Sequence, residues 1–331
     1  MLNEGVFMLT KKNLGLVLMC CVLGNIAFAN DERKTYDSQS IADVFYRLNG
    51  NAIKPKQKIN HTKGFCASGE FIPHKGIISS IDVPLLSQQS IPVEIRYSLG
   101  GAQQDDRSKP RGMALKFQGD KDTWTMVMLN TEINFSKNPQ EFGQFFEMRI
   151  PQENGKPDTE KIKRLTQKVS SYRNFEAYMK NIGISSLEHT GFYSIHTFYF
   201  QAPHKKANIA ARWKFVPKDG IKYLSEQELS KLDKDFLLSS FKSYTKNKPM
   251  EYDMYLIYPN KQDVTNDTTA LWKGAHKETL VGTLKVQKYN GTKCNAEVYF
   301  PSDLPAGVQP PKDPLFDTRN ATYALTFSRR Q

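Results

Sequence analysis

The sequence predicts a single α+β domain built on an antiparallel β-barrel with helical insertions. Short segments of alternating polar and apolar residues recur between residues 61 and 300, with segments of helical periodicity between them. This order favours an antiparallel barrel over a parallel sheet, in which each strand would be followed by a helix. No repeat or low-complexity linker interrupts residues 60–331, so we expect one domain over residues 30–331.

The first residues have the features of a targeting segment. Two lysines precede an apolar stretch over residues 14–23, and an A-x-A cleavage pattern ends at Ala29. We interpret residues 1–29 as a signal peptide, with its start at Met1 or at Met8. The alternative is a retained membrane anchor, but the apolar stretch is shorter than the ~20 residues that a span needs. A periplasmic or otherwise secreted protein is expected.

Two cysteines, Cys66 and Cys294, lie outside this leader. In an oxidising compartment such a pair favours a disulfide, and two free buried thiols are the alternative. The net charge of +12 keeps the protein soluble or attracts an anionic partner. Because the charge is spread along the chain and no nucleic-acid-binding pattern occurs, we expect no nucleic-acid partner.

The elements are expected in the following order. A polar arm over residues 30–58 is extended or partly helical. Strands are expected where polar and apolar residues alternate, over residues 93–98, 111–117, 125–135, 192–200, 209–216, 251–258, 280–287 and 298–300. Helices are expected after residue 139, over residues 158–181 and 225–241, and from about residue 314. In the first strand the alternation places Arg96 and Ser98 on one face.

No single motif in the chain identifies a chemistry. There is no phosphate loop, no G-x-S-x-G, no H-E-x-x-H, no dinucleotide fingerprint and no zinc spacing of cysteines. The six histidines are scattered, and a lone histidine is usually structural or solvated.

Several segments taken together are more informative, because they occur in the order in which haem catalases carry similar segments. They are Asn60–Gly64, Arg96–Ser98, Pro110–Phe117, Gly191–Phe198, Phe300–Pro310 and Asp313–Tyr323. The chain therefore resembles the catalase-like family, and within it the catalase-related peroxidases. The resemblance implies a haem pocket on the barrel, haem b as cofactor and a truncated C-terminus.

The resemblance makes Tyr323 the axial ligand of the haem iron. Arg319 lies four residues earlier, on the same face of a helix, where catalases pair an arginine with the phenolate. A phenol with an ordinary pKa of ~10 is not ionised at neutral pH, but a ferric ion and a guanidinium both favour the anion. Spacing alone would equally allow a tyrosine packed in a core.

On the opposite side of the haem, the resemblance makes His61 the residue that accepts and returns a proton during peroxide cleavage. Ser98 would hydrogen-bond to His61, and Asn130 keeps the second of two amides that catalases carry in this strand. Phe142 and Phe145 resemble the aromatic residues that line the distal side, although ordinary core residues of a helix would have the same pattern.

Three cations correspond to those that catalases place against the haem propionates, namely Lys58, Arg96 and Arg330. Paired cations offset carboxylates that are buried or half-buried. Lys58 stands where catalases usually have arginine, so its contact would be through a single ammonium group.

The sequence departs from catalase at two places. Leu129 takes the position of the distal asparagine and cannot donate a hydrogen bond to peroxide. The chain also ends eight residues after Tyr323. We therefore expect a peroxidase with little catalase activity, which uses a small organic electron donor. The alternatives are a fatty-acid hydroperoxide isomerase of the allene oxide synthase type and a haem-binding protein without turnover. The oligomeric state is left open.

Overall fold

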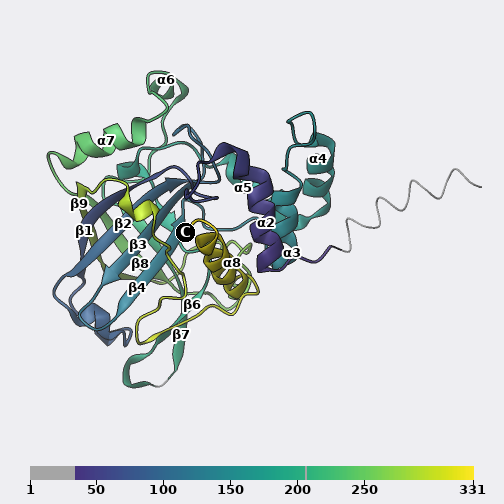
Figure 1. Cartoon of the computed structure of the whole chain (residues 1–331). Coiled ribbons are helices and arrows are strands. Elements are labelled where there is room, and N and C mark those ends of the chain that lie inside the picture. Colours follow the sequence, from purple (N-terminus) through teal and green to yellow (C-terminus); the bar gives the residue numbers. More distant parts are fainter. Residues whose placement is uncertain (1–33, 206) are drawn as a thin grey trace, which may run out of the picture. The chain divides into compact units, whose positions relative to one another are not determined.

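Eight antiparallel strands close into a barrel at the centre of the fold (Figure 1). The computed structural model describes residues 34–205 and 207–331, so the predicted signal peptide lies outside the described residues. From Tyr36 to Gln331 the chain forms one compact unit. The barrel with its helices confirms the predicted α+β fold class.

The barrel strands pair in the order β1, β2, β3, β4, β5, β7, β8 and β9, and β9 returns to β1. Their bounds are β1 Gly64–Pro73, β2 Ile91–Leu99, β3 Arg111–Gln118, β4 Thr123–Leu129, β5 Phe192–Tyr193, β7 Asn208–Pro217, β8 Met250–Ile257 and β9 Glu278–Tyr289. Two short strands, β6 (Phe198–Gln201) and β10 (Val308–Gln309), extend the sheet from β7. Since every neighbouring pair is antiparallel, the predicted topology is confirmed.

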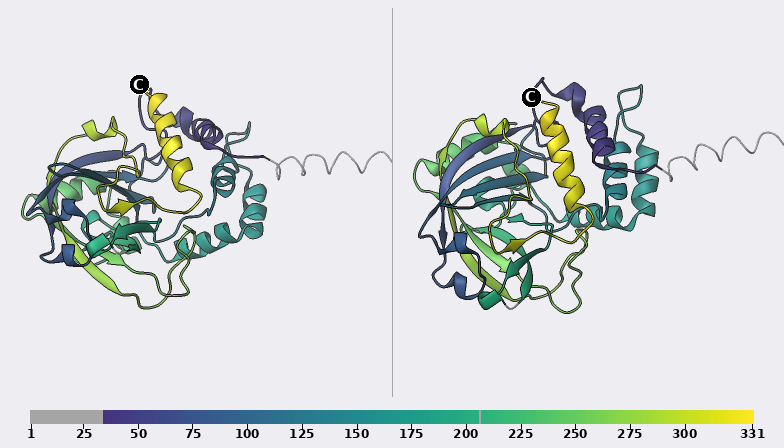
Figure 2. Two further views of the ribbon diagram at one scale, coloured as in Figure 1. Left: turned by 90° about the horizontal axis from the view of Figure 1, so that it is seen from below. Right: turned by 60° about the horizontal axis from the view of Figure 1, so that its bottom comes forward.

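The helices lie outside the barrel. Their bounds are α2 Ser38–Asn49, α3 Pro139–Glu147, α4 Thr159–Lys168, α5 Ser170–Lys180, α6 Glu226–Leu229, α7 Phe236–Thr245 and α8 Phe316–Ser328. Helix α2 contacts both α3 and α8, and the C-terminal α8 lies between α2 and the barrel (Figure 2). Within the described part of the chain, no helix has the length and apolar character to cross a membrane.

The interior of the barrel is a packed core and not a ligand cavity. Trp124 and Trp213 are fully buried there and meet edge to face, with 5.6 Å between ring centroids. Fully burying a large apolar side chain contributes about 1.5–3 kcal/mol relative to leaving it exposed. The pleat alternates, so residues such as Arg96 and Ser98 point to the outer face of β2, opposite the core residues Ile95 and Tyr97.

Two of the predicted helices are each divided in two. The helix expected over residues 158–181 breaks at Val169, whose φ of -92° and ψ of 117° are extended. A β-branched residue adopts this conformation readily. The helix expected over residues 225–241 breaks between α6 and α7, where Asp235 forms an ion pair with Lys63 at 2.7 Å. A tertiary contact that local periodicity does not encode thus accompanies the second break.

Three of the predicted strands differ as well. The strand expected over residues 125–135 ends at Leu129. The next residue, Asn130, contacts Arg111 twice, because its backbone N–H donates to the Arg111 carbonyl and its side-chain oxygen accepts from the Arg111 N–H. The strand expected over residues 192–200 is interrupted at residues 194–197, where His196 turns toward α8. Residues 298–300 form no strand.

Candidate functional site

A cavity of about 1260 Å³, part of it open to solvent, lies between the outer face of strands β2 to β4 and helices α2, α3 and α8. Its walls are mostly apolar, and its polar side chains form three groups. One group surrounds His61, one surrounds Tyr323, and one consists of cations.

His61 lies in the tight turn that precedes β1. Its φ of 54° is in the left-handed region, which a residue other than glycine adopts only when its surroundings enforce it. The Arg96 guanidinium donates to the His61 carbonyl at 2.6 Å. Gly112 on β3 leaves room for the imidazole, because a Cβ atom there would lie 3.1 Å from ring atoms of His61 and 2.9 Å from Ser98 Oγ. The turn and the neighbouring strands therefore hold the ring in place.

The imidazole of His61 is neutral at neutral pH. Burial lowers its pKa to about 3, and the positive charges of Arg96 and Arg319 act in the same direction. Its Nδ1 lies 3.1 Å from Ser98 Oγ. When Nδ1–H donates to that hydroxyl, Nε2 keeps its lone pair and can accept a proton.

Tyr323 lies on α8, one helical turn after Arg319, and both side chains line the cavity. The Arg319 guanidinium donates to the Tyr323 hydroxyl oxygen at 3.1 Å. Its other terminal nitrogen lies 2.5 Å from Nε2 of His196. His196 in turn contacts Asp313, with 2.7 Å between Nδ1 and Oδ2. Four side chains from two distant segments thus form one continuous hydrogen-bond network.

The hydrogen-bond donors determine which of these four side chains carry protons. A guanidinium only donates, so Nε2 of His196 accepts and Nδ1–H donates to the Asp313 carboxylate. Burial lowers the pKa of His196, consistent with a neutral ring. Burial would raise the pKa of Asp313, but His196 and the backbone N–H of Leu315 outweigh it and hold that pKa below its usual value. The carboxylate therefore stays ionised and orients Arg319 through His196.

The cations Lys58, Arg96 and Arg330 meet at another part of the cavity wall. None of the three forms an ion pair with a carboxylate in residues 34–205 and 207–331. Burial lowers the pKa of Lys58 to about 6. The charges of Arg96 and Arg330 lower this pKa further, and the Glu297 carboxylate acts in the opposite direction. Burial also lowers the pKa of Arg96 to about 10. Clustered cations that form no ion pair with a described carboxylate favour a negatively charged group in the cavity.

Most residues that the sequence singled out lie at this cavity. They are Lys58, His61, Arg96, Ser98, Phe142, Arg319, Tyr323 and Arg330. Leu129, the residue in place of the distal asparagine, lines it too.

The structure does not bring Asn130 and Phe145 to the cavity. The Asn130 amide bonds to the Arg111 N–H and the Lys109 carbonyl, each at 2.9 Å, and so holds two backbone segments together. The Phe145 ring stacks on Phe135, which lines the cavity, with 3.8 Å between centroids. Neither residue lines the cavity itself, and both make contacts beside it.

Sequence reasoning missed His196 and Asp313 as site residues. They are 117 residues apart, so no local spacing relates them. Each lies in a segment that resembles catalases, and only this resemblance could have indicated that they belong to the site.

The residues at the cavity fit an iron porphyrin. A phenol oxygen can ligate ferric iron, cations can meet the two carboxylates, and apolar walls can cover the ring. The described residues contain no cluster of three or more His, Cys, Asp or Glu side chains able to hold a metal ion.

Comparison with known proteins agrees with a haem-binding cavity. Residues 41–331 match the catalase family. The chain is 31% identical over 283 residues to a catalase-related peroxidase of Synechococcus elongatus, covering 83% of each chain. It is 24% identical over 291 residues to a catalase-related peroxidase of Mycolicibacterium paratuberculosis, covering 84% of this chain and 90% of that protein.

Solved structures share the fold. A bacterial catalase superposes with a TM-score of 0.75 at 17% identity, covering 99% of this chain and 64% of that one. Catalase A of Saccharomyces cerevisiae gives a TM-score of 0.74 at 17% identity, covering 99% and 68%.

Proposed function

The chain belongs to the catalase family, and we propose that it is a haem-dependent peroxidase that reduces hydrogen peroxide or organic peroxides with electrons from an organic donor. One observation carries the proposal. The His61–Ser98 pair and the Arg319–Tyr323 pair line the same cavity, so a proton acceptor and an iron ligand are available to one bound group.

We propose haem b as the cofactor, with Tyr323 as its iron ligand. Lys58, Arg96 and Arg330 would hold its carboxylates. When bound, the haem supplies the ferric centre at which the peroxide O–O bond breaks. Arg319 donates to the Tyr323 oxygen and so helps to hold it in the cavity lining.

His61 supplies the proton chemistry in this proposal. As a neutral imidazole it accepts a proton from peroxide at Nε2 and returns it to the departing oxygen. Ser98 keeps the ring oriented through Nδ1. The cations Arg96 and Arg319 oppose protonation of the ring and so keep its Nε2 lone pair free before peroxide binds.

We propose that dismutation of hydrogen peroxide is weak. Dismutation requires a second peroxide molecule to be oriented as reductant, and Leu129 offers no hydrogen bond for this. The part of the cavity that is open to solvent instead gives an organic donor access.

We also propose that the protein works outside the cytoplasm, in the periplasm or as a secreted protein. The Cys66–Cys294 disulfide supports this, since such bonds persist mainly in oxidising compartments. The predicted signal peptide over residues 1–29 supports it too.

The proposal is tested by oxidation of a phenolic donor by peroxide, catalysed by the haem-loaded protein. His61→Gln should lower the rate by about 10²- to 10⁴-fold while haem stays bound. His74→Gln, at an exposed histidine outside the cavity lining, is the matched control and should keep most of the rate. With a lipid hydroperoxide the product should be the alcohol. Haem uptake without donor oxidation, or an allene oxide as product, would contradict a peroxidase.

A further inference from the structure

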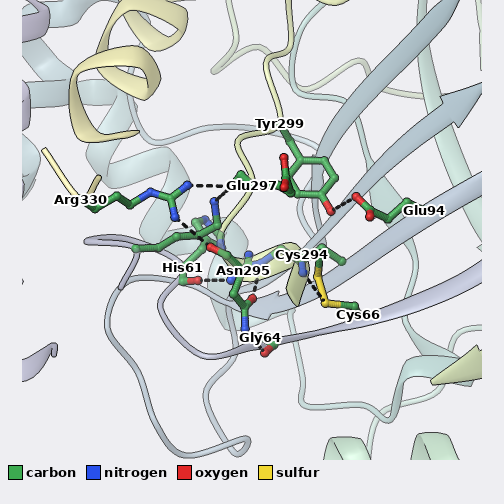
Figure 3. The surroundings of a disulfide bond; sticks show 11 residues. His61, Gly64, Cys66, Glu94, Cys294, Asn295, Glu297, Tyr299 and Arg330 are labelled. Atoms are coloured by element: carbon green, nitrogen blue, oxygen red, sulfur yellow. Dashed lines mark hydrogen bonds between the residues drawn. A yellow bond between two sulfur atoms is a disulfide. The ribbon is translucent and has the colours of Figure 1, made fainter. Parts of the chain in front are cut away.

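The turn Lys293–Asn295 is tied to strand β1 by the Cys66–Cys294 disulfide (Figure 3). The bond joins residues 228 positions apart, and the Cys294 N–H also donates to Cys66 Sγ at 3.0 Å. The two cysteines are buried with Tyr299 against Ala114 and Val127, which line the cavity. The disulfide therefore lies directly behind the cavity wall.

The residue after Cys294 contacts two of the cavity cations. Asn295 accepts from Nε of Arg96 through its side-chain oxygen at 2.7 Å. Its backbone carbonyl accepts from Arg330 at 3.0 Å. Its side-chain nitrogen donates to the Gly64 carbonyl at 2.9 Å, at the start of β1. One amide side chain thus joins Arg96 on β2 to the start of β1 through its acceptor and its donor.

The third cation joins the same segment at Glu297. The carbonyl of Glu297 accepts from Arg330 at 2.8 Å and from the Lys58 ammonium group. All the acceptors in residues 295–297 are neutral oxygens, which orient the cations but do not neutralise them. The Glu297 carboxylate acts to raise the pKa of Lys58 and of Arg330 but forms no ion pair with either among the described contacts, so much of the positive charge is left for a ligand carboxylate.

The contacts of Asn295 extend through Arg96 to His61, the proposed proton acceptor. Arg96 bonds to Asn295 through Nε and to the His61 carbonyl through a terminal nitrogen, at 2.7 and 2.6 Å. A shift of Asn295 would therefore move the Arg96 guanidinium and remove its hydrogen bond to the His61 carbonyl. Figure 3 shows His61, Asn295 and Arg330 near one another.

We propose that Asn295, anchored by the Cys66–Cys294 disulfide, is a positioning residue of the cofactor pocket that holds Arg96 and Arg330 toward the carboxylates of haem. Opening the disulfide then weakens haem binding. The inference rests on the proposed function in one respect, that the ligand is haem.

The test measures the dissociation constant of haem for the apoprotein by titration of the haem absorption band. Asn295→Ala should weaken binding about ten- to hundredfold, as expected when a hydrogen bond to a charged group is lost. Asn290→Ala is the matched control, because Asn290 is an exposed asparagine nearby whose side chain has no hydrogen bond among the described contacts. It should leave the constant unchanged.

Haem dimethyl ester, which lacks free carboxylates, separates positioning from a general loss of structure. If Asn295 acts through the cations, Asn295→Ala and the wild type should bind the ester equally. An equal loss for haem and for the ester would mean a merely structural role and would overturn the proposal. The Cys66→Ser, Cys294→Ser double variant should show a smaller loss with the same dependence on free carboxylates.

The outcomes also separate this inference from the proposed function. A wild type that binds haem and its ester equally would contradict the assignment of the cations to the cofactor. A wild type that prefers haem, with Asn295→Ala and the double variant unchanged, would overturn the inference alone.

Discussion

Haem affinity should fall as the pH rises above 6, because of Lys58. In the ligand-free protein, burial and the neighbouring cations Arg96 and Arg330 lower the pKa of this lysine to about 6. Two ligand carboxylates would favour the ammonium form and raise the pKa again. Above pH 6 the haem-bound protein therefore carries more protons than the free protein, and raising the pH opposes binding.

The size of the change in haem affinity follows from the lowered pKa of Lys58. At pH 6 about half of the Lys58 side chains in the free protein are protonated, and at pH 8 about one in a hundred. The dissociation constant of haem should accordingly rise about 50-fold between pH 6 and pH 8, which approaches tenfold per pH unit.

The assay is the haem titration repeated at pH 6, 7, 8 and 9 at one ionic strength. Lys58→Arg is the comparison, since a guanidinium stays charged over this range and should remove most of the pH dependence. Parallel pH profiles for the wild type and Lys58→Arg would refute the reasoning, because the linked proton would then belong to another group.

Three further predictions concern the cavity and its support. Leu129→Asn restores an amide donor and should raise oxygen release from hydrogen peroxide at least about tenfold over the Leu129→Met control; an unchanged oxygen-electrode rate would contradict this. Cys66→Ser with Cys294→Ser should lower the free energy of unfolding by about 2–5 kcal/mol in urea titrations, and an unchanged midpoint would show that the disulfide adds little. The folded pKa of His61, about 3, lies below the unfolded value of ~6.5, so the unfolded chain binds more protons in that window and apoprotein stability should rise with pH from 3 to 6.5. His61→Gln should flatten that part of the profile, and an equally steep profile would assign it to other groups.

The elements that sequence predicted best are those that depend on local alternation. Strands β2 and β3 agree with expectation to within two residues, because one face of each carries apolar residues that pack in the barrel and the other carries more polar ones. The breaks in the longer elements were not predictable in this way. The interruption between β5 and β6, for example, accompanies the contact of His196 with Arg319, far away in the chain.

The site was predictable where the family resemblance placed whole segments, and less so residue by residue. His61 and Ser98 lie together as expected, since the turn before β1 and the outer face of β2 are adjacent in the barrel. Asn130 has the expected residue type, but its amide is used by the backbone of β3. The Asp313–His196 contact depends on packing between two remote segments, which no single segment encodes.

The central claim is that Tyr323 ligates the haem iron, and the absorption spectrum of the ferric haem protein tests it most directly. Tyr323→Phe removes the only ligating atom of this side chain and keeps its ring. We expect the spectrum of the reconstituted variant to lose the features of a phenolate-ligated ferric haem. A variant that binds haem and has the same ferric spectrum as the wild type would contradict the claim.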